Sequence, residues 1–154
     1  MEKRLSMTII PKPKERPRAA IIGGHARIFT PKTTEAYEKE IRAAWIRNNG
    51  NKPEEGPLRA RIYFGLPIPK SETKTNKALM IARKVFPTKK PDLDNLAKAV
   101  LDALNGVAYK DDSQIVTMLS RKNYAEVPYV KVILSEETPK EDESDVTSAE
   151  KTRK

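Results

Sequence analysis

The sequence predicts one domain of the α/β (α+β) class, in which a small mixed β-sheet packs with two main helices. Three observations favour this class. The chain has 154 residues, which is room for one ordinary hydrophobic core. Residues 58–66 (LRARIYFGL) alternate apolar and polar side chains with the period of a half-buried strand. Residues 92–106 repeat apolar side chains with the period of an amphipathic helix, so strands and helices are expected in one unit.

The first thirty residues indicate a strand, an extended arm and a hairpin, in that order. Residues 6–10 (SMTII) are typical of a short strand. The segment 11–18 (PKPKERPR) is expected to be extended, because proline lacks the amide hydrogen that a helix uses. Two apolar stretches, AAII and ARIF, flank Gly23-Gly24-His25, and glycines between such stretches indicate a hairpin turn with His25 in it.

The next segment is typical of an amphipathic helix. It is expected to begin at Thr33 or Thr34 with a threonine cap and to end at Asn49. Tyr37 and Trp45 recur on one face of this helix, which indicates that both belong to the core rather than to a surface that stacks on bases.

The second half of the chain continues the alternation of element types. The clearest helix is expected to start with Asp92 as its N-cap and to stop at Gly106. The remaining expectations are a short helix at 76–85, an extended segment at 86–91, a polar turn at 107–113, and two strands at 114–125 and 128–135 that pair with each other in antiparallel fashion.

Composition excludes several classes of protein. The chain has no cysteine and one histidine, which excludes a disulfide framework and makes a zinc site of the usual kind unexpected, so any metal is expected to have oxygen ligands. No apolar stretch approaches the roughly 18 residues that span a bilayer. No signal-peptide core follows MEKRLS, so a cytoplasmic protein is expected.

Charge is distributed unevenly along the chain. Residues 136–154 hold seven acidic and four basic side chains and are expected to form a disordered acidic tail. Residues 1–135, the expected folded domain, therefore carry a net charge of +12. Such a charge favours polyanionic partners such as nucleic acid, although membrane-binding and protein-binding domains can also be basic.

Acidic residues stand at the borders of the predicted elements. Asp92 and Asp94 open the clearest helix, Lys98 follows Asp94 by one turn, and Asp111-Asp112 precedes a predicted strand. Two or three carboxylates are a sufficient protein share for Mg²⁺, and a lysine can add positive charge beside a scissile phosphate. Structural interpretations remain open, because Asp92 can serve only as a cap and Asp94, Lys98 and Asp102 can form an exposed ladder of ion pairs. Asp111-Asp112 can likewise form a simple turn.

Taken together, residues 89–115 (KKPDLDNLAKAVLDALNGVAYKDDSQI) resemble the signature of the RusA family of Holliday junction resolvases. The shared pattern is PD-x-DN-x-x-K-x-x-x-D-x-L followed by DD-x-Q. The opening is similar too, with PKPKERPR and the stretch IFTPKTTEAYEKEIR, so the resemblance covers residues 6–135.

The resemblance implies a small homodimeric, Mg²⁺-dependent endonuclease, for which Mn²⁺ can substitute, that cuts four-way DNA junctions by paired nicks. Asp92, Asp94 and Asp112 then match the family's metal-binding acids, and Lys98 matches its catalytic lysine. Spacing alone does not decide between Asp111 and Asp112, and we choose Asp112 by its distance to Gln114.

Basic residues near these acids are candidates for DNA contacts. The resemblance suggests Lys89 and Lys90, which Arg59 and Arg61 could supplement, and the arm adds Lys12, Lys14, Arg16 and Arg18. A non-catalytic basic DNA-binding module and a nuclease for other branched DNA remain alternatives. The family also suggests the cytoplasm of a bacterium or of a phage-infected cell.

Overall fold

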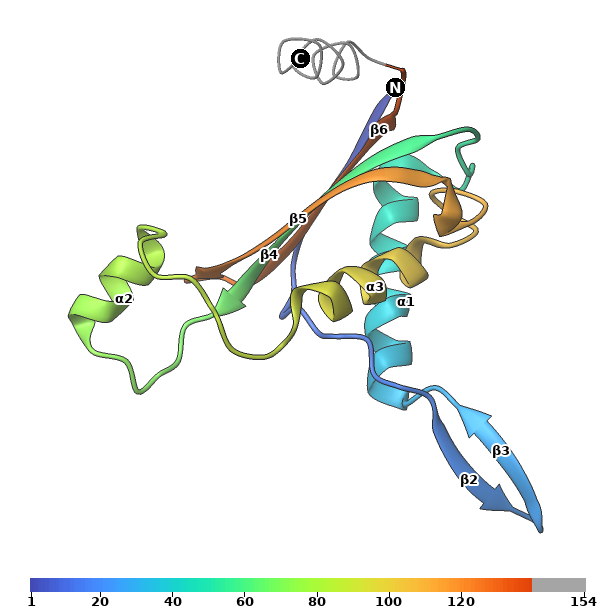
Figure 1. Ribbon diagram of the computed structural model, residues 1–154, viewed down its shortest axis with the longest axis horizontal. Coiled ribbons are helices and arrows are strands. Elements are labelled where there is room, and N and C mark those ends of the chain that lie inside the picture. Colours follow the sequence, from blue (N-terminus) through green and yellow to red (C-terminus); the bar gives the residue numbers. More distant parts are fainter. Residues whose placement is uncertain (140–154) are drawn as a thin grey trace, which may run out of the picture.

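A computed structural model describes residues 1–139, which form a four-stranded sheet, a separate two-stranded hairpin and three helices (Figure 1). The elements are β1 (Glu2–Thr8), β2 (Arg18–Ile22), β3 (His25–Phe29), α1 (Lys32–Asn49), β4 (Leu58–Pro67), α2 (Lys74–Ile81), α3 (Leu93–Leu104), the 3-10 turn η1 (Asp112–Gln114), β5 (Ile115–Ala125) and β6 (Tyr129–Glu136). The predicted α+β class is therefore confirmed, with a mixed sheet. Among the described residues, no helix has the length and apolar character needed to cross a bilayer.

The order of strands in the sheet is β1-β6-β4-β5, with β6 antiparallel to both neighbours and β4 parallel to β5. The predicted pairing of β5 with β6 is wrong, because β4 lies between them. The three residues that join them suffice for this arrangement, since an extended chain advances about 3.3 Å per residue and one skipped strand adds only about 5 Å.

One face of the sheet carries the hydrophobic core. The alternation predicted for β4 is confirmed, because its even-numbered side chains are buried and its odd-numbered ones are more exposed. Helices α1 and α3 cover this face, and Tyr37 and Trp45 lie in the core as predicted. The main contributors from the three elements are Leu58, Ile62, Phe64, Ile41, Trp45, Leu96, Val100 and Leu104. Each fully buried side chain of this size stabilises the fold by about 2 kcal/mol.

The predicted threonine cap of α1 is wrong. The helix begins at Lys32, directly after Pro31, and no side chain caps it. Thr34 is instead buried in the first turn, and the hydroxyl of Thr33 donates to Glu15 at 3.3 Å. The helix ends at Asn49 as predicted, where Gly50 has a φ of 80° and its amide donates to the carbonyl of Ile46.

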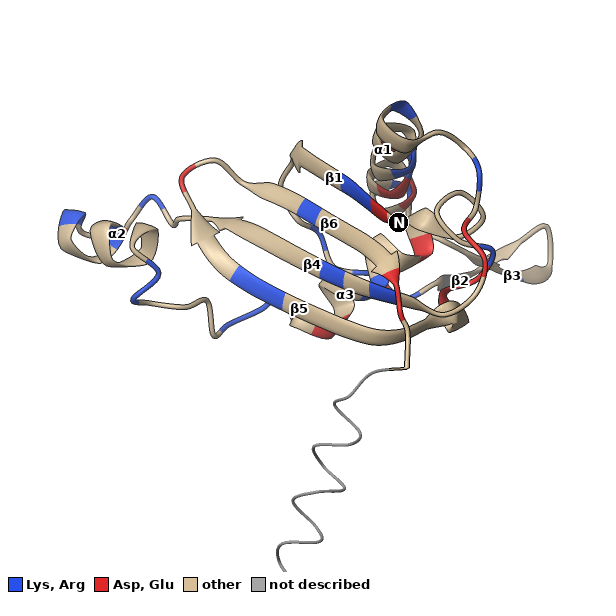
Figure 2. Cartoon of the chain, turned by 90° about the horizontal axis from the view of Figure 1, so that it is seen from above, with Lys and Arg blue, Asp and Glu red and all other residues tan. Residues whose placement is uncertain are grey.

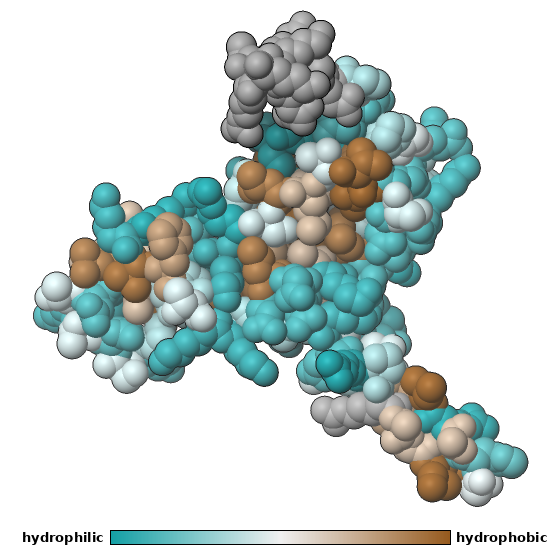
Figure 3. Space-filling view, viewed as in Figure 1, coloured by the Kyte–Doolittle hydropathy of each residue, from teal (hydrophilic) through white to brown (hydrophobic). Residues whose placement is uncertain are grey.

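Two elements project from this body (Figure 1). The predicted hairpin is formed by β2 and β3, with Gly23 and Gly24 at positive φ in its turn. The prediction that His25 lies in the turn is wrong, because His25 is the first residue of β3 and pairs with Ile22. Its apolar side chains are exposed, Ile21 at 81% and Ile28 at 79%, and they colour the hairpin brown in Figure 3. On the other side, α2 begins after Thr73, whose hydroxyl caps the amide of Asn76, and it is shorter than the predicted helix.

The prediction of a polar turn at residues 107–113 is only partly right, because the first half of this segment lies in the hydrophobic core. Residues 107–109 are buried, and the hydroxyl of Tyr109 donates to the carbonyl of Leu101 at 2.6 Å. Only the residues after Tyr109 form a polar turn, because the apolar half of this segment closes the core at the end of α3.

The predicted border of the tail falls inside ordered structure. Strand β6 includes Glu136, and the amide of Glu137 donates to the carbonyl of Pro57 at 3.0 Å. The rest of the predicted tail, residues 140–154, lies outside the described residues, so its disorder stays a prediction.

Candidate active site

The two aspartates at the start of α3 present exposed carboxylates. Asp92 is the N-cap residue by position, as predicted, but its side chain makes no capping hydrogen bond. Asp94 lies in the first turn, where its Oδ1 accepts a hydrogen bond from the amide of Asn95 at 2.9 Å. The N-terminal end of a helix carries partial positive charge, which attracts carboxylates placed there. The purely structural capping role is therefore not the one that Asp92 adopts.

Lys98 lies one turn beyond Asp94 and is 59% exposed. Its Nζ is 3.9 Å from Asp102, which is the limit of an ion pair, and such an exposed contact contributes little to stability. The ammonium group of Lys98 is therefore only loosely tied and can turn toward a bound phosphate.

A groove of about 690 Å³ borders this end of the helix. The extended arm, the segment before α3 and the end of β4 form its walls, and its lining includes Lys14, Lys89, Lys90, Asp92, Asn95 and Tyr124. Three lysines and one of the two free carboxylates thus share one concave surface. An anionic backbone with a bound cation fits this combination of charges.

Lys122 fixes the wall of the groove that carries Lys89 and Lys90. Its Nζ donates to the carbonyl of Lys89 and to the carbonyl of Pro91, both at 2.9 Å. Lys122 shares the helix-covered face of the sheet with Phe64, its cross-strand neighbour. Sequence reasoning missed this residue, since nothing in a β-rich stretch signals that a lysine will bind backbone carbonyls about 30 residues earlier.

The arm is clamped to both main helices by Lys14. Its amide donates to the carbonyl of Asn95 at 2.9 Å, and its Nζ contacts Glu38 of α1 at 2.5 Å and Asp102 of α3 at 3.1 Å. Burial opposes the charge of this lysine, but the hydrogen bonds to Glu38 and Asp102 outweigh it and raise the pKa of Lys14. Lys14 therefore positions the arm, and its predicted contact with DNA stays a prediction.

The other predicted arm contacts are less constrained. Lys12 and Arg16 are exposed beside the groove-lining part of the arm, where phosphate can reach them. For Arg18 the structure describes only the backbone, which begins β2.

The two aspartates of DD-x-Q have different surroundings. Asp111 caps η1 by accepting a hydrogen bond from the amide of Ser113. The side chain of Ser113 and, after it, this amide lower the pKa of Asp111. Gln114 holds the same turn, because its Oε1 accepts from the amides of Lys110 and Asp111 and its Nε2 donates to two carbonyls of residues 54–56. Asp111 is thus used by the turn itself, whereas Asp112 takes no part in this cap.

Asp112 lies near the far end of α3. Burial raises the pKa of Tyr109, and the neighbouring carboxylates of Asp112 and Asp102 raise it further, which places both acids near this ring. Asp102 follows Asp94 by two turns, or about 12 Å along the helix axis. Within residues 1–139, no three side chains of the metal-binding types lie close enough together to hold one ion. The structure thus places Asp92 and Asp94 together at the start of α3 but does not bring Asp112 to them, and the share of Asp112 in the site stays a prediction.

The remaining pair of exposed carboxylates suits Mg²⁺. This ion prefers oxygen ligands and usually keeps several waters, so Asp92 and Asp94 are a sufficient protein share. This pair of ligands contains neither sulfur nor imidazole, in keeping with a chain that has no cysteine and only one histidine.

Arg59 and Arg61 lie apart from this groove. Both alternate with buried residues of β4, so they occupy the sheet face opposite α1 and α3. They cannot extend the patch of Lys89 and Lys90 on the same surface, and any contact that they make with DNA belongs to the other face.

Comparison with known proteins gives matches over most of the chain. The family model described as Endodeoxyribonuclease RusA matches residues 9–135. A protein of Bacillus subtilis (strain 168), named uncharacterized protein YqaN, is 34% identical over 128 residues, which cover 82% of this chain and 90% of the relative. Because the family match spans most of the chain, including the start of α3 and η1, the protein belongs to the RusA family of Holliday junction-resolving endodeoxyribonucleases.

Proposed function

We propose that the protein is a Mg²⁺-dependent homodimeric nuclease that resolves four-way DNA junctions by paired, symmetric nicks during recombination and repair. The observation that carries this proposal is the pair of exposed carboxylates, Asp92 and Asp94, at the start of α3 beside a groove that Lys89 and Lys90 line. Family membership supplies the reaction class, which is hydrolysis of phosphodiester bonds in DNA.

Each residue of this site has a distinct proposed role. Asp92 and Asp94 would hold Mg²⁺, or Mn²⁺ in its place. Asp112 is the third ligand that the family resemblance implies, although within residues 1–139 it does not lie in one group with the other two acids. The bound cation would activate a water and offset the charge that develops on the phosphate. Lys98 supplies a further positive charge to the phosphate or the leaving oxygen, and its weak tie to Asp102 leaves it free to do so.

Binding and positioning are separate from the chemical step. Lys89 and Lys90 face the groove and would neutralise backbone phosphates near the acids. Lys122 keeps their backbone in place through the two carbonyl hydrogen bonds. Contacts with phosphates recognise the charge and shape of the DNA backbone, so selectivity for a four-way junction would come mainly from the geometry of the DNA.

A homodimer suits a substrate that must be cut twice. Two nicks at symmetric points need two equivalent active sites, and an isologous dimer relates its sites by a two-fold axis. We place this dimer in the cytoplasm of a bacterium or of a phage-infected cell, where such DNA is found.

The test uses a synthetic four-way junction labelled on each strand. We expect nicks in two strands of like polarity with Mg²⁺ and none with excess chelator. A replication fork and a linear duplex serve as matched substrates, because a nuclease for other branched DNA would cut the fork at least as fast. Cleavage that persists in chelator would contradict the assigned role of the metal.

A further inference from the structure

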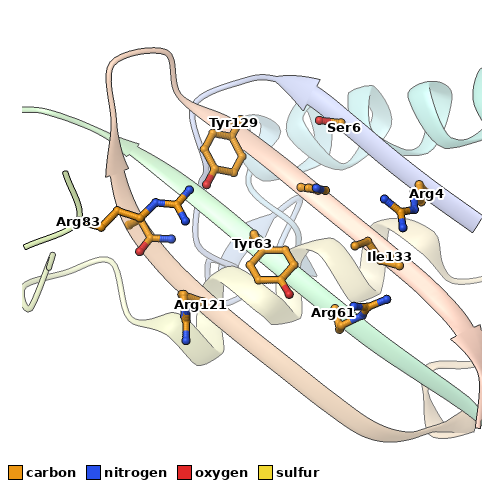
Figure 4. A pocket seen from close by; sticks show the side chains of 10 residues that line it. Arg4, Ser6, Arg61, Tyr63, Arg83, Arg121, Tyr129 and Ile133 are labelled. Atoms are coloured by element: carbon orange, nitrogen blue, oxygen red, sulfur yellow. The ribbon is translucent and has the colours of Figure 1, made fainter. Parts of the chain in front are cut away.

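The sheet face opposite the helices holds a second basic surface. An open hollow of about 590 Å³ lies on it, lined by residues of all four strands and by Arg83, which follows α2 (Figure 4). Blue segments on these strands mark its basic residues in Figure 2. The cations that line the hollow are Arg4, Arg61, Arg83, Arg121 and Lys131. Arg4 and Arg61 pair with Glu2, which lies outside the lining, whereas Arg83, Arg121 and Lys131 form no ion pair with another of the described residues.

The register of the strands places the ring of Tyr63 between two cationic side chains. Tyr63 of β4 lies opposite Lys131 of β6 on one side and Arg121 of β5 on the other. Directly paired residues on one sheet face have Cβ atoms about 5 Å apart, so these three side chains are immediate neighbours. Figure 4 shows Tyr63 in the middle of the hollow with Arg121 to one side.

The next row of paired residues in the sheet adds the ring of Tyr129 and the side-chain carbonyl of Asn123. Tyr129 and Asn123 flank Gly65, and a Cβ at Gly65 would overlap the ring of Tyr129, which therefore lies across the strand. Asn123 is 2% exposed, lines the hollow, and its Oδ1 has no hydrogen-bond partner among the described residues. A buried carbonyl without a partner is costly, so a ligand that donates a hydrogen bond to this oxygen would be favoured at the hollow.

These features favour one class of occupant. A second copy of the chain would bring two sets of cations together, which is electrostatically unfavourable. A duplex backbone would satisfy the arginines but would leave the tyrosine rings and the Asn123 amide unused. An unpaired strand offers phosphates, base faces for stacking and base edges that donate hydrogen bonds, so it uses all three.

We propose that the open face of the sheet, at Arg121, Lys131, Tyr63, Tyr129 and Asn123, binds single-stranded DNA. This site is separate from the groove beside α3, because the sheet itself lies between them. The inference does not depend on metal-assisted cleavage, so it can fail or hold whatever the outcome of the junction-nicking test.

The experiment measures binding of the full chain to a labelled oligothymidylate of about 20 nucleotides by fluorescence anisotropy, with chelator present to prevent cutting. Arg121→Glu is expected to raise the Kd about tenfold or more, because the exposed arginine contacts phosphate. Tyr129→Leu is expected to raise it about tenfold, whereas Tyr129→Phe keeps it within about twofold because the stacking ring remains.

Three controls make the result specific. Lys39→Glu reverses an exposed charge on α1 and should leave the Kd unchanged. The double variant Lys89→Ala/Lys90→Ala should weaken binding of a four-way junction but not of oligothymidylate. An abasic strand of equal length has the phosphates without the bases and should bind clearly more weakly than oligothymidylate.

Several results would overturn the inference. One is an unchanged Kd in Arg121→Glu, which keeps the test valid even where Tyr129→Leu does not fold. Another is equal binding of the abasic strand, which would reduce the surface to a phosphate-binding patch. A change of molar mass in Arg121→Glu, measured by light scattering, would assign this face to a contact between two copies instead.

Discussion

The two ends of α3 surround their carboxylates in opposite ways. At its start, Asp92 makes no capping hydrogen bond and Asp94 accepts only one, from the amide of its neighbour. Near its end, Asp102 is bound by Lys14 at 3.1 Å and approached by Lys98 at 3.9 Å. Carboxylates that no described lysine or arginine binds are available to a cation, whereas a carboxylate in an ion pair is part of the scaffold. One amphipathic helix therefore carries both a reaction site and the anchor that positions it.

Asp94→Asn tests the start of the helix and should have the largest effect. We expect Mg²⁺-dependent nicking of a four-way junction to fall by roughly 1,000-fold or more, because the neutral amide is a poor metal ligand. Junction binding should persist, because the groove lysines are unchanged. Rates come from single-turnover nicking assays, and affinity comes from anisotropy in chelator.

The matched change at the other end is Asp102→Asn. It removes the same charge from the same helix, but it should slow nicking only a few-fold and should instead lower the free energy of unfolding. Wild-type nicking by Asp94→Asn, or a loss in Asp102→Asn as large as in Asp94→Asn, would break the distinction between the two ends.

Lys98 lies between the two ends of α3, and its replacement tests whether it acts in the nicking reaction or in the stability of the fold. Lys98→Ala should slow nicking by about 10-fold to 100-fold, through loss of a positive charge at the phosphate. The free energy of unfolding should change by no more than about 0.5 kcal/mol, because the side chain is exposed and its ion pair is long. Urea titration measures this quantity, and a large drop would assign Lys98 to the scaffold. Lys98→Arg, which keeps the charge, should recover part of the activity.

Lys14→Met tests the anchor itself. The variant leaves Glu38 and Asp102 as neighbouring negative charges without their shared partner, so we expect a loss of about 1–2 kcal/mol in the free energy of unfolding. This loss should be smaller than for a fully buried ion pair, because the side chain of Lys14 is 18% exposed. Lys12→Met is the control on the same arm and should change stability little, because Lys12 is exposed.

The comparison also explains what sequence could predict. Periodicity located β4, α1 and α3, because local apolar spacing records which face each element buries. It also placed Asp92 at a helix start, since Pro91 and the following apolar repeat are local signals. The threonine cap of α1 failed because Pro31 begins that helix without a side-chain cap.

The features that sequence missed are contacts across long separations. The clamp of Lys14 on Asp102 and the hold of Lys122 on Lys89 each join segments about 30 or more residues apart. The position of β4 between β5 and β6 is of the same kind. Local sequence patterns do not determine which distant segment a side chain contacts, so these contacts could not be predicted from the spacing of residues along the chain. The distance of Asp112 from the other two acids belongs to this group as well.

Alkaline pH should lower the free energy of unfolding through groups near the arm, by less than the Lys14→Met change does. Burial raises the pKa of Tyr37 to about 12, although a hydrogen bond with the backbone of Lys12 in the arm lowers it in part. An unfolded tyrosine releases its proton near pH 10, so the stabilising difference is complete below pH 10 and is lost as pH rises from 10 to 12. At pH 11 the loss from this group should be about 1 kcal/mol. The raised pKa of Lys14 has the same effect, because its contribution to stability is also lost as pH rises.

Urea titrations at pH 8 and pH 11 measure the total loss in the free energy of unfolding, and Tyr37→Phe should lose less stability between these two pH values than the wild type. Equal losses in both proteins would mean that the ring beneath the arm does not contribute to the alkaline sensitivity of the anchor.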